Sequence, residues 1–334
     1  MIWVFYSLLS MVLGALGAWI VMRLGGNYGL IDLPGYRSSH KRPTPKGGGI
    51  GIVIAFIFVS IFNAVPVALW GPAVIISVIG LVDDRVELAK SKRLLMQVGC
   101  ALVMLWGANP LAGPTALPPL LSFTIGTLFI VGTANFFNFM DGINGIAGIS
   151  ASVGFGLLAI HGVLQGAPAP FILLDLCMVA ACIGFLPFNL PRAKVFMGDT
   201  GSVFLGFLFA VIAWQSNATF LGVISCAAFF FLIYADAATT FGIRIVEGDQ
   251  ILVAHRRHLY QILVNELGLA HWKVSLGYGI AQVLIGIIVI ALQSIGMTAL
   301  VAGVTVMGLL FVAASVTLHR KADRVAALHS LESL

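Results

Sequence analysis

Long apolar runs separated by short polar segments dominate this chain. From Pro110 to Met140 the sequence contains no Asp, Glu, Lys or Arg, and the same is true from Gly142 to Leu174. An uncharged run of about 18 residues or more is long enough for one helical crossing of a bilayer. Such runs recur along the whole length, so the pattern predicts an all-α, polytopic integral membrane protein.

We expect about eleven transmembrane helices, at residues 2–23, 48–66, 68–82, 93–108, 119–137, 143–163, 169–188, 201–215, 219–243, 274–293 and 297–318. The second and third share one charge-free run, which Pro66, Gly71 and Pro72 interrupt. Proline and glycine in these positions mark a break between helices. The chain contains no convincing internal repeat or soluble segment, so residues 1–334 are interpreted as a single transmembrane domain.

The composition supports a membrane protein. Of the 334 residues, 60% are hydrophobic and 9% are charged, whereas a soluble domain carries about a quarter charged residues. The four cysteines lie in apolar segments without paired spacing. They are therefore expected to be small buried side chains and not disulfides or zinc ligands.

The basic residues predict an orientation. With the N-terminus placed outside, all 18 Lys and Arg residues fall on inward-facing segments or their edges, as the positive-inside rule requires. The C-terminus is then cytoplasmic. The net charge of +5 suits anionic lipid or phosphate at the membrane surface. No pattern typical of nucleic-acid binding is present.

Acidic residues collect on the same inner side, and three sites lie at predicted helix ends. Asp83 and Asp84 close the third span in GLVDDR, Asp141 lies between the fifth and sixth, and Asp199 precedes the eighth in MGDTGS. Asp141 and Asp199 could simply be N-caps, and the paired acids a solvated turn. Together, however, these acids and their glycines resemble a Mg²⁺–diphosphate site, because Mg²⁺ usually takes one or two protein carboxylates and completes its shell with water and phosphate oxygens.

Two basic segments could meet the phosphates. Residues 29–49 combine Arg37, His40, Lys41, Arg42 and Lys46 with a run of three glycines. In residues 247–261, His255 and His258 are three apart and would share a helical face, with Arg256 and Arg257 between them. The alternative for the second segment is a basic patch against anionic lipid. Zinc is disfavoured, since two histidines leave the site incomplete.

Five motifs, in this order, resemble the polyprenyl-phosphate N-acetylhexosamine-1-phosphate transferases, the glycosyltransferase family 4 enzymes that include the peptidoglycan lipid translocase and the O-antigen and common-antigen initiators. The motifs are RSSHKRPTPKGGG, GLVDDR, NFFNFMDGINGIAG, FNLPRAKVFMGDTGS and HRRHLYQ, within residues 29–261. The resemblance implies a single transmembrane catalytic domain whose active site is built on cytoplasmic loops. It also implies a multi-pass protein of the bacterial inner membrane with a periplasmic N-terminus.

The reaction implied by the resemblance is Mg²⁺-dependent, with Mn²⁺ as an alternative ion. A polyprenyl phosphate such as undecaprenyl phosphate attacks a UDP-N-acetylhexosamine, giving polyprenyl-diphospho-sugar and UMP. The lipid bilayer is the other partner, no nucleic acid is involved, and a homodimer remains open. We favour a single in-line displacement over a covalent carboxyl-phosphate on Asp83 or Asp84.

The resemblance also assigns roles to individual residues. Asp199 and Asp84 are metal candidates, Asp83 is the candidate for deprotonating or orienting the lipid phosphate, and His255 and His258 complete the catalytic set. The candidates for substrate binding are His40, Lys46, Asn138, Asp141, Asn189, Arg256 and Asp236.

One departure from the family bears on the sugar. Members that transfer N-acetylglucosamine phosphate commonly have HxHH, whereas this chain has HRRH at residues 255–258. That pattern is more similar to O-antigen initiators using deoxy sugars, so GlcNAc, FucNAc and QuiNAc all stay open. For Asp175, within the seventh span, a structural hydrogen bond or an outer-interface position is favoured.

Two other classes of protein were weighed. A nucleotide-sugar or lipid-substrate transporter should show repeat symmetry and polar sites near mid-bilayer, but the polar groups here gather at one face. A lipid-binding scaffold needs no acids arranged for a metal.

Overall fold

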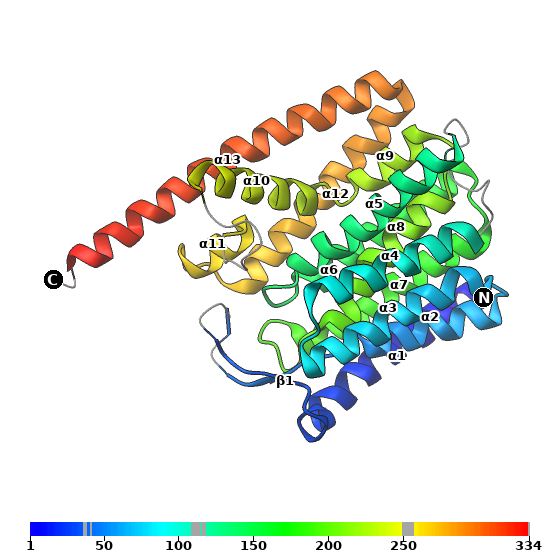
Figure 1. Ribbon diagram of the computed structural model, residues 1–334, viewed down its shortest axis with the longest axis horizontal. Coiled ribbons are helices and arrows are strands. Elements are labelled where there is room, and N and C mark those ends of the chain that lie inside the picture. The colour runs from blue at the N-terminus through cyan, green and yellow to red at the C-terminus, as the bar shows by residue number, and fades with distance from the viewer. Residues whose placement is uncertain (36–38, 41, 108–113, 115–117, 249–256, 333–334) are drawn as a thin grey trace.

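The structure is a computed structural model, and it describes all residues except 36–38, 41, 108–113, 115–117, 249–256 and 333–334. Its described part is almost entirely helical (Figure 1). The elements are α1 Ile2–Leu24, η1 Gly25–Tyr28, β1 Ile31–Asp32, β2 Thr44–Pro45, α2 Ile50–Phe62, α3 Val67–Val86, α4 Lys90–Gly107, α5 Pro119–Phe139, α6 Ile146–Gln165, α7 Ala169–Asn189, α8 Asp199–Gln215, α9 Phe220–Ala228, α10 Phe231–Glu247, α11 Leu259–Asn265, α12 His271–Ile295 and α13 Met297–Glu332.

The all-α polytopic prediction is confirmed, and each of the eleven predicted segments coincides with helix. The count of eleven crossings is not confirmed. Within the described residues, seven helices are long and apolar enough to cross a membrane, or up to eight if one bent pair counts as a span. The difference arises because α2 and α8 are short apolar helices and α4 begins with the charged stretch KSKR.

The predicted span at 219–243 is not one continuous helix. It is divided into α9 and α10, which meet at an angle of 78°. Phe229 and Phe230 lie at the break and are fully buried. The Phe230 ring stacks on Phe209 of α8 with centroids 3.7 Å apart. The chain therefore turns where two aromatic side chains are anchored in the core.

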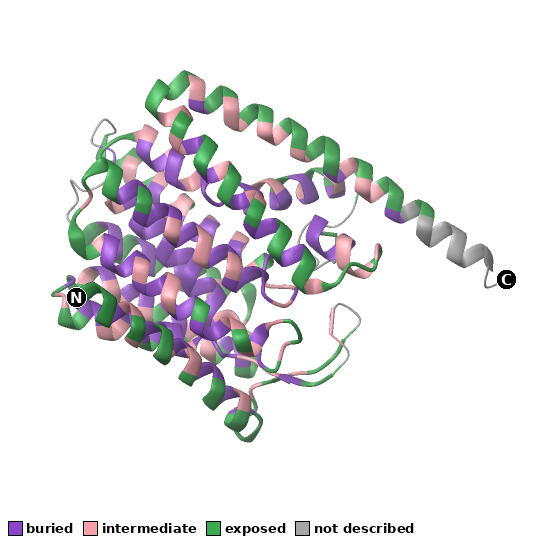
Figure 2. Cartoon of the chain, turned by 180° about the vertical axis from the view of Figure 1, so that it is seen from behind, coloured by how far each residue is buried: buried purple, intermediate pink, exposed green. Residues whose placement is uncertain are grey.

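Helix α8 is the centre of the bundle. Every residue from Thr200 to Trp214 is buried, and α8 packs against α3 on one side and α5 on the other. A helix that is apolar all round is stable only where other helices surround it. Figure 2 shows the buried interior in purple, whereas α13 is largely exposed and extends beyond the body toward the C-terminus.

The segment after α1 folds over one end of the bundle. Strands β1 and β2 form an antiparallel pair with Ile31 opposite Pro45. The glycine run that follows β2 bonds to the chain before α8, since the amide of Gly48 donates to the carbonyl of Phe196 at 2.9 Å. These bonds fix Lys46 near the start of α8.

Asp175 differs from its expectation in part. It is buried in α7 with 2% of its surface exposed, but its Oδ1 has no hydrogen-bond partner among the described residues. The expected structural hydrogen bond is therefore not seen at that oxygen.

Close contact between α1 and α7 generates the first prediction. A Cβ added to Gly184 of α7 would lie 2.0 Å from the carbonyl oxygen of Met11 in α1. Gly184→Ala should therefore lower the melting temperature of the detergent-solubilised protein, because overpacking a tight contact costs about 1–3 kcal/mol. Gly277→Ala in α12 is the matched control, since nothing lies within 4 Å of its added Cβ. The control should be neutral or stabilising, as alanine is the better helix former. Equal melting temperatures for the two variants would contradict this prediction.

Candidate functional site

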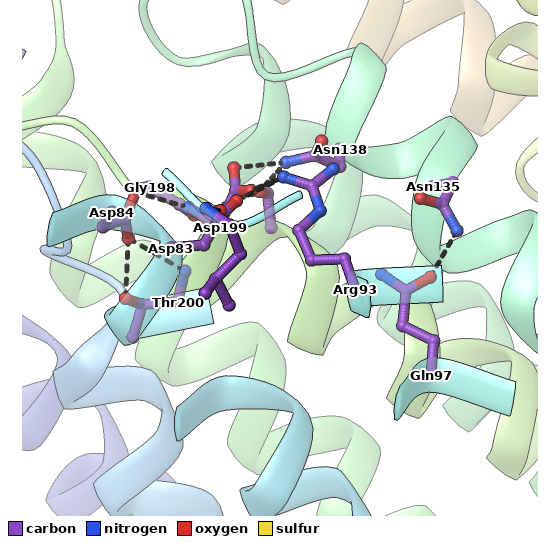
Figure 3. A network of polar contacts seen from close by, with 11 residues as sticks. Asp83, Asp84, Arg93, Gln97, Asn135, Asn138, Gly198, Asp199 and Thr200 are labelled. Carbon is purple, nitrogen blue, oxygen red and sulfur yellow. Dashed lines mark hydrogen bonds and ion pairs between the residues drawn. The ribbon is translucent and has the colours of Figure 1, made fainter. Parts of the chain in front are cut away.

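Three of the sequence motifs meet where helix ends converge at one end of the bundle. The last turn of α3 supplies Asp83 and Asp84, the first residue of α8 is Asp199, and the last turns of α5 supply Asn138 (Figure 3). The amide of Asn138 donates to Oδ1 of Asp199 at 2.8 Å and to Oγ of Ser202 at 2.9 Å. Residues from two separate motifs are thus in direct contact.

Asp84 caps helix α8 from another helix. Its Oδ1 accepts the backbone N–H of Asp199 at 3.1 Å, and its Oδ2 accepts the N–H of Thr200 at 3.1 Å and the hydroxyl of Thr200 at 2.8 Å. A carboxylate at a helix N-terminus satisfies unpaired N–H groups and faces the positive end of the helix dipole. Asp84 is 6% exposed, so these bonds satisfy a buried charge.

Gly198 is required for this arrangement. It precedes α8 with φ of +73°, and an added Cβ would lie 2.4 Å from Oδ2 of Asp84. Glycine adopts this conformation without steric cost. The glycine of MGDTGS therefore lets the chain approach the Asp84 carboxylate closely enough to be capped.

Arg93 of α4 links the remaining carboxylates. Its Nη1 donates to Oδ2 of Asp199 at 2.6 Å and also forms an ion pair with Oδ2 of Asp83 (Figure 3). The other oxygen of Asp83 accepts the N–H of Leu88 at 2.5 Å. The sequence predicts no site role for Arg93, because its neighbours Lys90 and Lys92 carry the same charge and nothing in the spacing separates the three.

A cavity of about 340 Å³ opens beside these residues. Seven of the predicted site residues line it: His40, Lys46, Asp84, Asn138, Asp141, Asn189 and Asp199. Gln261 and His271 line it as well, and neither was predicted. Asp83 does not line the cavity, since its carboxylate is directed into the contacts with Arg93 and Leu88.

A wider cavity of about 850 Å³ adjoins the first and shares Ser39, His40, Asn144, Phe196 and His271 with it. Arg42 and Arg192 also line this second cavity, and none of its described lining residues is acidic. The two adjoining cavities thus differ in charge: arginines line the wider one, and Asp84, Asp141 and Asp199 line the narrower one.

Asn189 and Asp141 have different surroundings. Asn189 accepts the N–H of Gly145 at 2.5 Å and donates to the carbonyl of Val195 at 2.9 Å, so it fixes the backbone of two loops that form the cavity wall. Asp141 lies in the turn between α5 and α6, and its carboxylate makes no hydrogen bond with any described residue. Asp141 is half-buried in the cavity wall. Its loss of solvation there, together with the charges of Asp199 and Asp84, raises the pKa of Asp141 well above its usual range.

Neither of the two proposed N-caps is one. The cap position of α8 is Gly198 and that of α6 is Gly145. Asp199 is instead the first residue of α8, and Asp141 lies four residues before Gly145. The capping explanation therefore leaves both carboxylates unexplained.

The structure places Asp236 and His258 in a neighbouring buried cluster. Asp236 of α10 accepts the N–H of Leu259 at 2.9 Å and the hydroxyl of Tyr278 at 3.2 Å, and lies 3.3 Å from Nδ1 of His258. Neither Asp236 nor His258 lines the 340 Å³ cavity. They hold the start of α11, and α11 directs Gln261 into that cavity. His255 and Arg256 lie outside the described residues.

Tyr260 connects the two groups. Its hydroxyl donates to the carbonyl of Phe139 at 2.7 Å, next to the turn that carries Asp141. Burial, with the charges of Asp236 and Asp141, raises the pKa of Tyr260 well above its usual range. The tyrosine is therefore a neutral hydrogen-bond donor between the two acids.

The site fits a hard cation shared with a ligand, but not a cation held by protein alone. Among the residues that the structure describes, no group of three or more His, Cys, Asp or Glu side chains is arranged to hold a metal ion. The donors near Asp199 are oxygen atoms, which Mg²⁺ prefers, and Mg²⁺ is commonly bound by one or two carboxylates plus substrate phosphates. The donor chemistry therefore fits Mg²⁺ at Asp199.

The raised pKa of Asp141 generates a pH-dependent prediction. In the unfolded chain Asp141 ionises near its ordinary value of about 3.9, whereas in the folded protein it ionises at higher pH. Stability is therefore lost as pH rises through this window, because the folded state must then bury the charged form. Asp141→Asn should raise the melting temperature at pH 8, and by less at pH 4.

Differential scanning fluorimetry at the two pH values measures the effect. Glu266 is exposed, so Glu266→Gln is the control and should change neither melting temperature. An Asp141→Asn variant that is less stable than the natural chain at pH 8 would refute the assignment of a costly buried carboxylate.

Comparison with known proteins agrees with the motifs. Residues 66–217 match the model of "Glycosyl transferase family 4". A protein of Bacillus subtilis named "Probable undecaprenyl-phosphate N-acetylglucosaminyl 1-phosphate transferase" is 29% identical over 270 residues, which cover 75% of this chain and 74% of that protein. A phospho-N-acetylmuramoyl-pentapeptide-transferase of Chlamydia trachomatis is 33% identical over 54% of this chain and 63% of its own length.

A third relative is a decaprenyl-phosphate N-acetylglucosaminephosphotransferase of Mycobacterium tuberculosis. It is 32% identical over 57% of this chain and 54% of its own length. The matched region 66–217 includes Asp83, Asp84, Arg93, Asn138 and Asp199. The resemblance seen in the motifs is thus confirmed by a match of residues 66–217 to glycosyl transferase family 4.

Proposed function

We propose that this protein transfers an N-acetylhexosamine 1-phosphate from a UDP-sugar to a polyprenyl phosphate, giving polyprenyl-diphospho-sugar and UMP. One observation carries the proposal. Asp84, Asp199, Asn138 and Asp141, which come from three separate motifs, border one cavity at a single end of a helical membrane bundle. The names of the bacterial relatives support a polyprenyl-phosphate sugar-phosphate transferase in general.

The nucleotide-sugar donor is assigned to the 340 Å³ cavity, with the adjoining 850 Å³ cavity as its proposed entrance. His40 and Lys46 line the first cavity together with the acids, and Arg42 and Arg192 line the second. A UDP-sugar is anionic, so positive side chains at the entrance attract it. Asp141, inside the cavity, can accept hydrogen bonds from the nucleotide.

Asp199 is the proposed ligand of Mg²⁺, with Asp84 beside it. The ion, when bound, would neutralise charge on the diphosphate as it reacts. The Asp84 carboxylate already accepts three hydrogen bonds from the start of α8. Its main task is therefore to hold Asp199 in place.

The polyprenyl chain is assigned to an apolar groove. A cavity of about 910 Å³ lies between α9, α10 and α13, and most of the residues that line it are Ala, Val, Ile, Phe and Gly. His319 and Arg320 lie among the lining residues, so the groove combines a hydrocarbon wall with basic groups. An isoprenoid tail with a phosphate headgroup has the matching chemistry.

Asp83 is proposed to orient the acceptor phosphate more than to take its proton. Both of its carboxylate oxygens are already engaged, one by Arg93 and one by the N–H of Leu88. A phosphate monoester loses its second proton near pH ~6, so it is largely dianionic at neutral pH. A single in-line displacement therefore needs no strong base and no covalent carboxyl-phosphate.

The sugar and the pathway are finer proposals. Among GlcNAc, FucNAc and QuiNAc, the HRRH motif favours a deoxy-N-acetylhexosamine for O-antigen or related cell-envelope polysaccharide synthesis. The proposed location is the bacterial inner membrane, with a periplasmic N-terminus and a cytoplasmic active site. A homodimer is compatible with this arrangement.

The decisive assay uses purified protein with a radiolabelled UDP-N-acetylhexosamine, Mg²⁺ and undecaprenyl phosphate. Label should appear in lipid, and UMP should form in equal amount. Asp199→Asn should reduce the rate by at least about 10²-fold, the scale on which removal of one electrostatic catalytic group acts. Glu266→Gln, an exposed acid outside the cavity, is the matched control and should retain activity.

Two outcomes would contradict the proposal. One is passage of UDP-sugar across sealed vesicles without formation of lipid-linked sugar, which would identify a transporter. The other is exchange of labelled UMP into UDP-sugar without any lipid acceptor, which would identify a covalent intermediate and reject the single displacement.

A further inference from the structure

Arg93 occupies an unusual position between two carboxylates. One guanidinium nitrogen, Nη1, contacts Oδ2 of Asp199 at 2.6 Å and Oδ2 of Asp83 as well. The two acids come from different helices, α8 and α3, and the arginine from a third, α4. One nitrogen of the guanidinium group therefore holds together two carboxylates that would otherwise repel each other.

The arginine is incompletely satisfied in this place. Its Nε is buried and has no hydrogen-bond partner among the described residues. Arginine binds a carboxylate most strongly with two parallel N–H groups, whereas here one nitrogen serves two acids. A buried donor without a partner costs free energy. Arg93 therefore holds Asp199 through Nη1, without the second parallel bond of a bidentate pair.

The charges of the site favour a second cation. Asp84, Asp141 and Asp199 line one cavity, and Asp83 shares Arg93 with Asp199. Among the described residues, Arg93 and Lys46 are the cations whose charges act on Asp83, Asp84 or Asp199. When all four acids are ionised, the group carries two negative charges in excess. A divalent cation balances that excess.

We propose that Arg93 is an internal counter-ion that competes with the divalent metal for Asp199. In the metal-free protein its guanidinium holds Asp199 and Asp83 together. Metal binding at Asp199 displaces the guanidinium from that carboxylate, and Arg93 keeps its contact with Asp83. Arg93 is a positioning residue in this proposal, since it acts through Asp83 and Asp199.

The competition has a consequence for the order of binding. Because Arg93 opposes it, a metal ion gains little from Asp199 alone. The diphosphate of the donor supplies further oxygen ligands, so metal and donor should bind best together. This coupling rests on the proposed metal role of Asp199, while the competition itself requires no transfer reaction.

The test measures Mn²⁺ binding to the full-length chain in detergent, without substrates, from the electron paramagnetic resonance signal of free Mn²⁺. Arg93→Gln should bind Mn²⁺ about fivefold more tightly or better, because a neutral side chain no longer competes for Asp199. Lys92→Gln is the matched control, since it removes one positive charge from the neighbouring exposed position on α4. Its affinity should stay within about twofold of the natural chain, because an exposed charge is screened.

Asp199→Asn should abolish the gain in Mn²⁺ affinity when it is combined with Arg93→Gln, which identifies the site. Thermal unfolding provides an independent readout. In EDTA, Arg93→Gln should melt below Lys92→Gln because the carboxylates repel, and Mn²⁺ should remove that difference. Should Arg93→Gln fail to fold, Arg93→Lys replaces it. The Mn²⁺ affinity of that variant should lie above the affinity of the natural chain and below that of a chain with no cation at position 93.

Equal or weaker Mn²⁺ binding by Arg93→Gln would overturn the proposal, because Arg93 would then support the metal site or act elsewhere. An equal gain in Lys92→Gln would overturn it too, since the effect would come from total charge. Tighter binding by Arg93→Gln in a chain that transfers no sugar phosphate would instead refute the proposed function and leave the competition intact.

Discussion

The bond between the Asp84 carboxylate and the first turn of α8 is the constraint on which the site depends. Three donors from Asp199 and Thr200 converge on this buried carboxylate. A buried charge is tolerated only when it is hydrogen-bonded, so α3 and α8 cannot separate without exposing both the charge and the unpaired helix N–H groups. The cap therefore fixes Asp199 in the wall of the 340 Å³ cavity, and Gly198 leaves room for it.

Electrostatic balance is the second condition. Several carboxylates lie close together at the end of an apolar bundle, where charges interact more strongly than in water. The helix N-terminus relieves Asp84, Arg93 links Asp83 to Asp199, and Asp141 responds with a raised pKa. The site is thus stable only with positive partners, and that requirement makes it suited to bind a cation and an anionic nucleotide together.

The described part of the histidine motif attaches α11 to the rest of the bundle. HRRHLYQ stood out in the sequence because two histidines lie three residues apart. In the structure, His258 and the N–H of Leu259 contact the buried Asp236, and Tyr260 reaches back to Phe139. These bonds dock α11 so that Gln261 lines the cavity. An isolated acid in a membrane helix thus serves as the anchor for a loop from farther along the chain.

The sequence by itself determined the helical membrane class, the helix segments and seven of the residues that line the cavity, because hydrophobic runs and clustered acids are local properties of a chain. Only the tertiary structure decided which residues touch. Arg93 could not be distinguished from Lys90 or Lys92 in the sequence, because all three are basic residues at the start of one helix. The acids that bind Arg93 lie on other helices, α3 and α8. Likewise, the break between α9 and α10 depends on where Phe230 packs, and packing is a property of the assembled bundle.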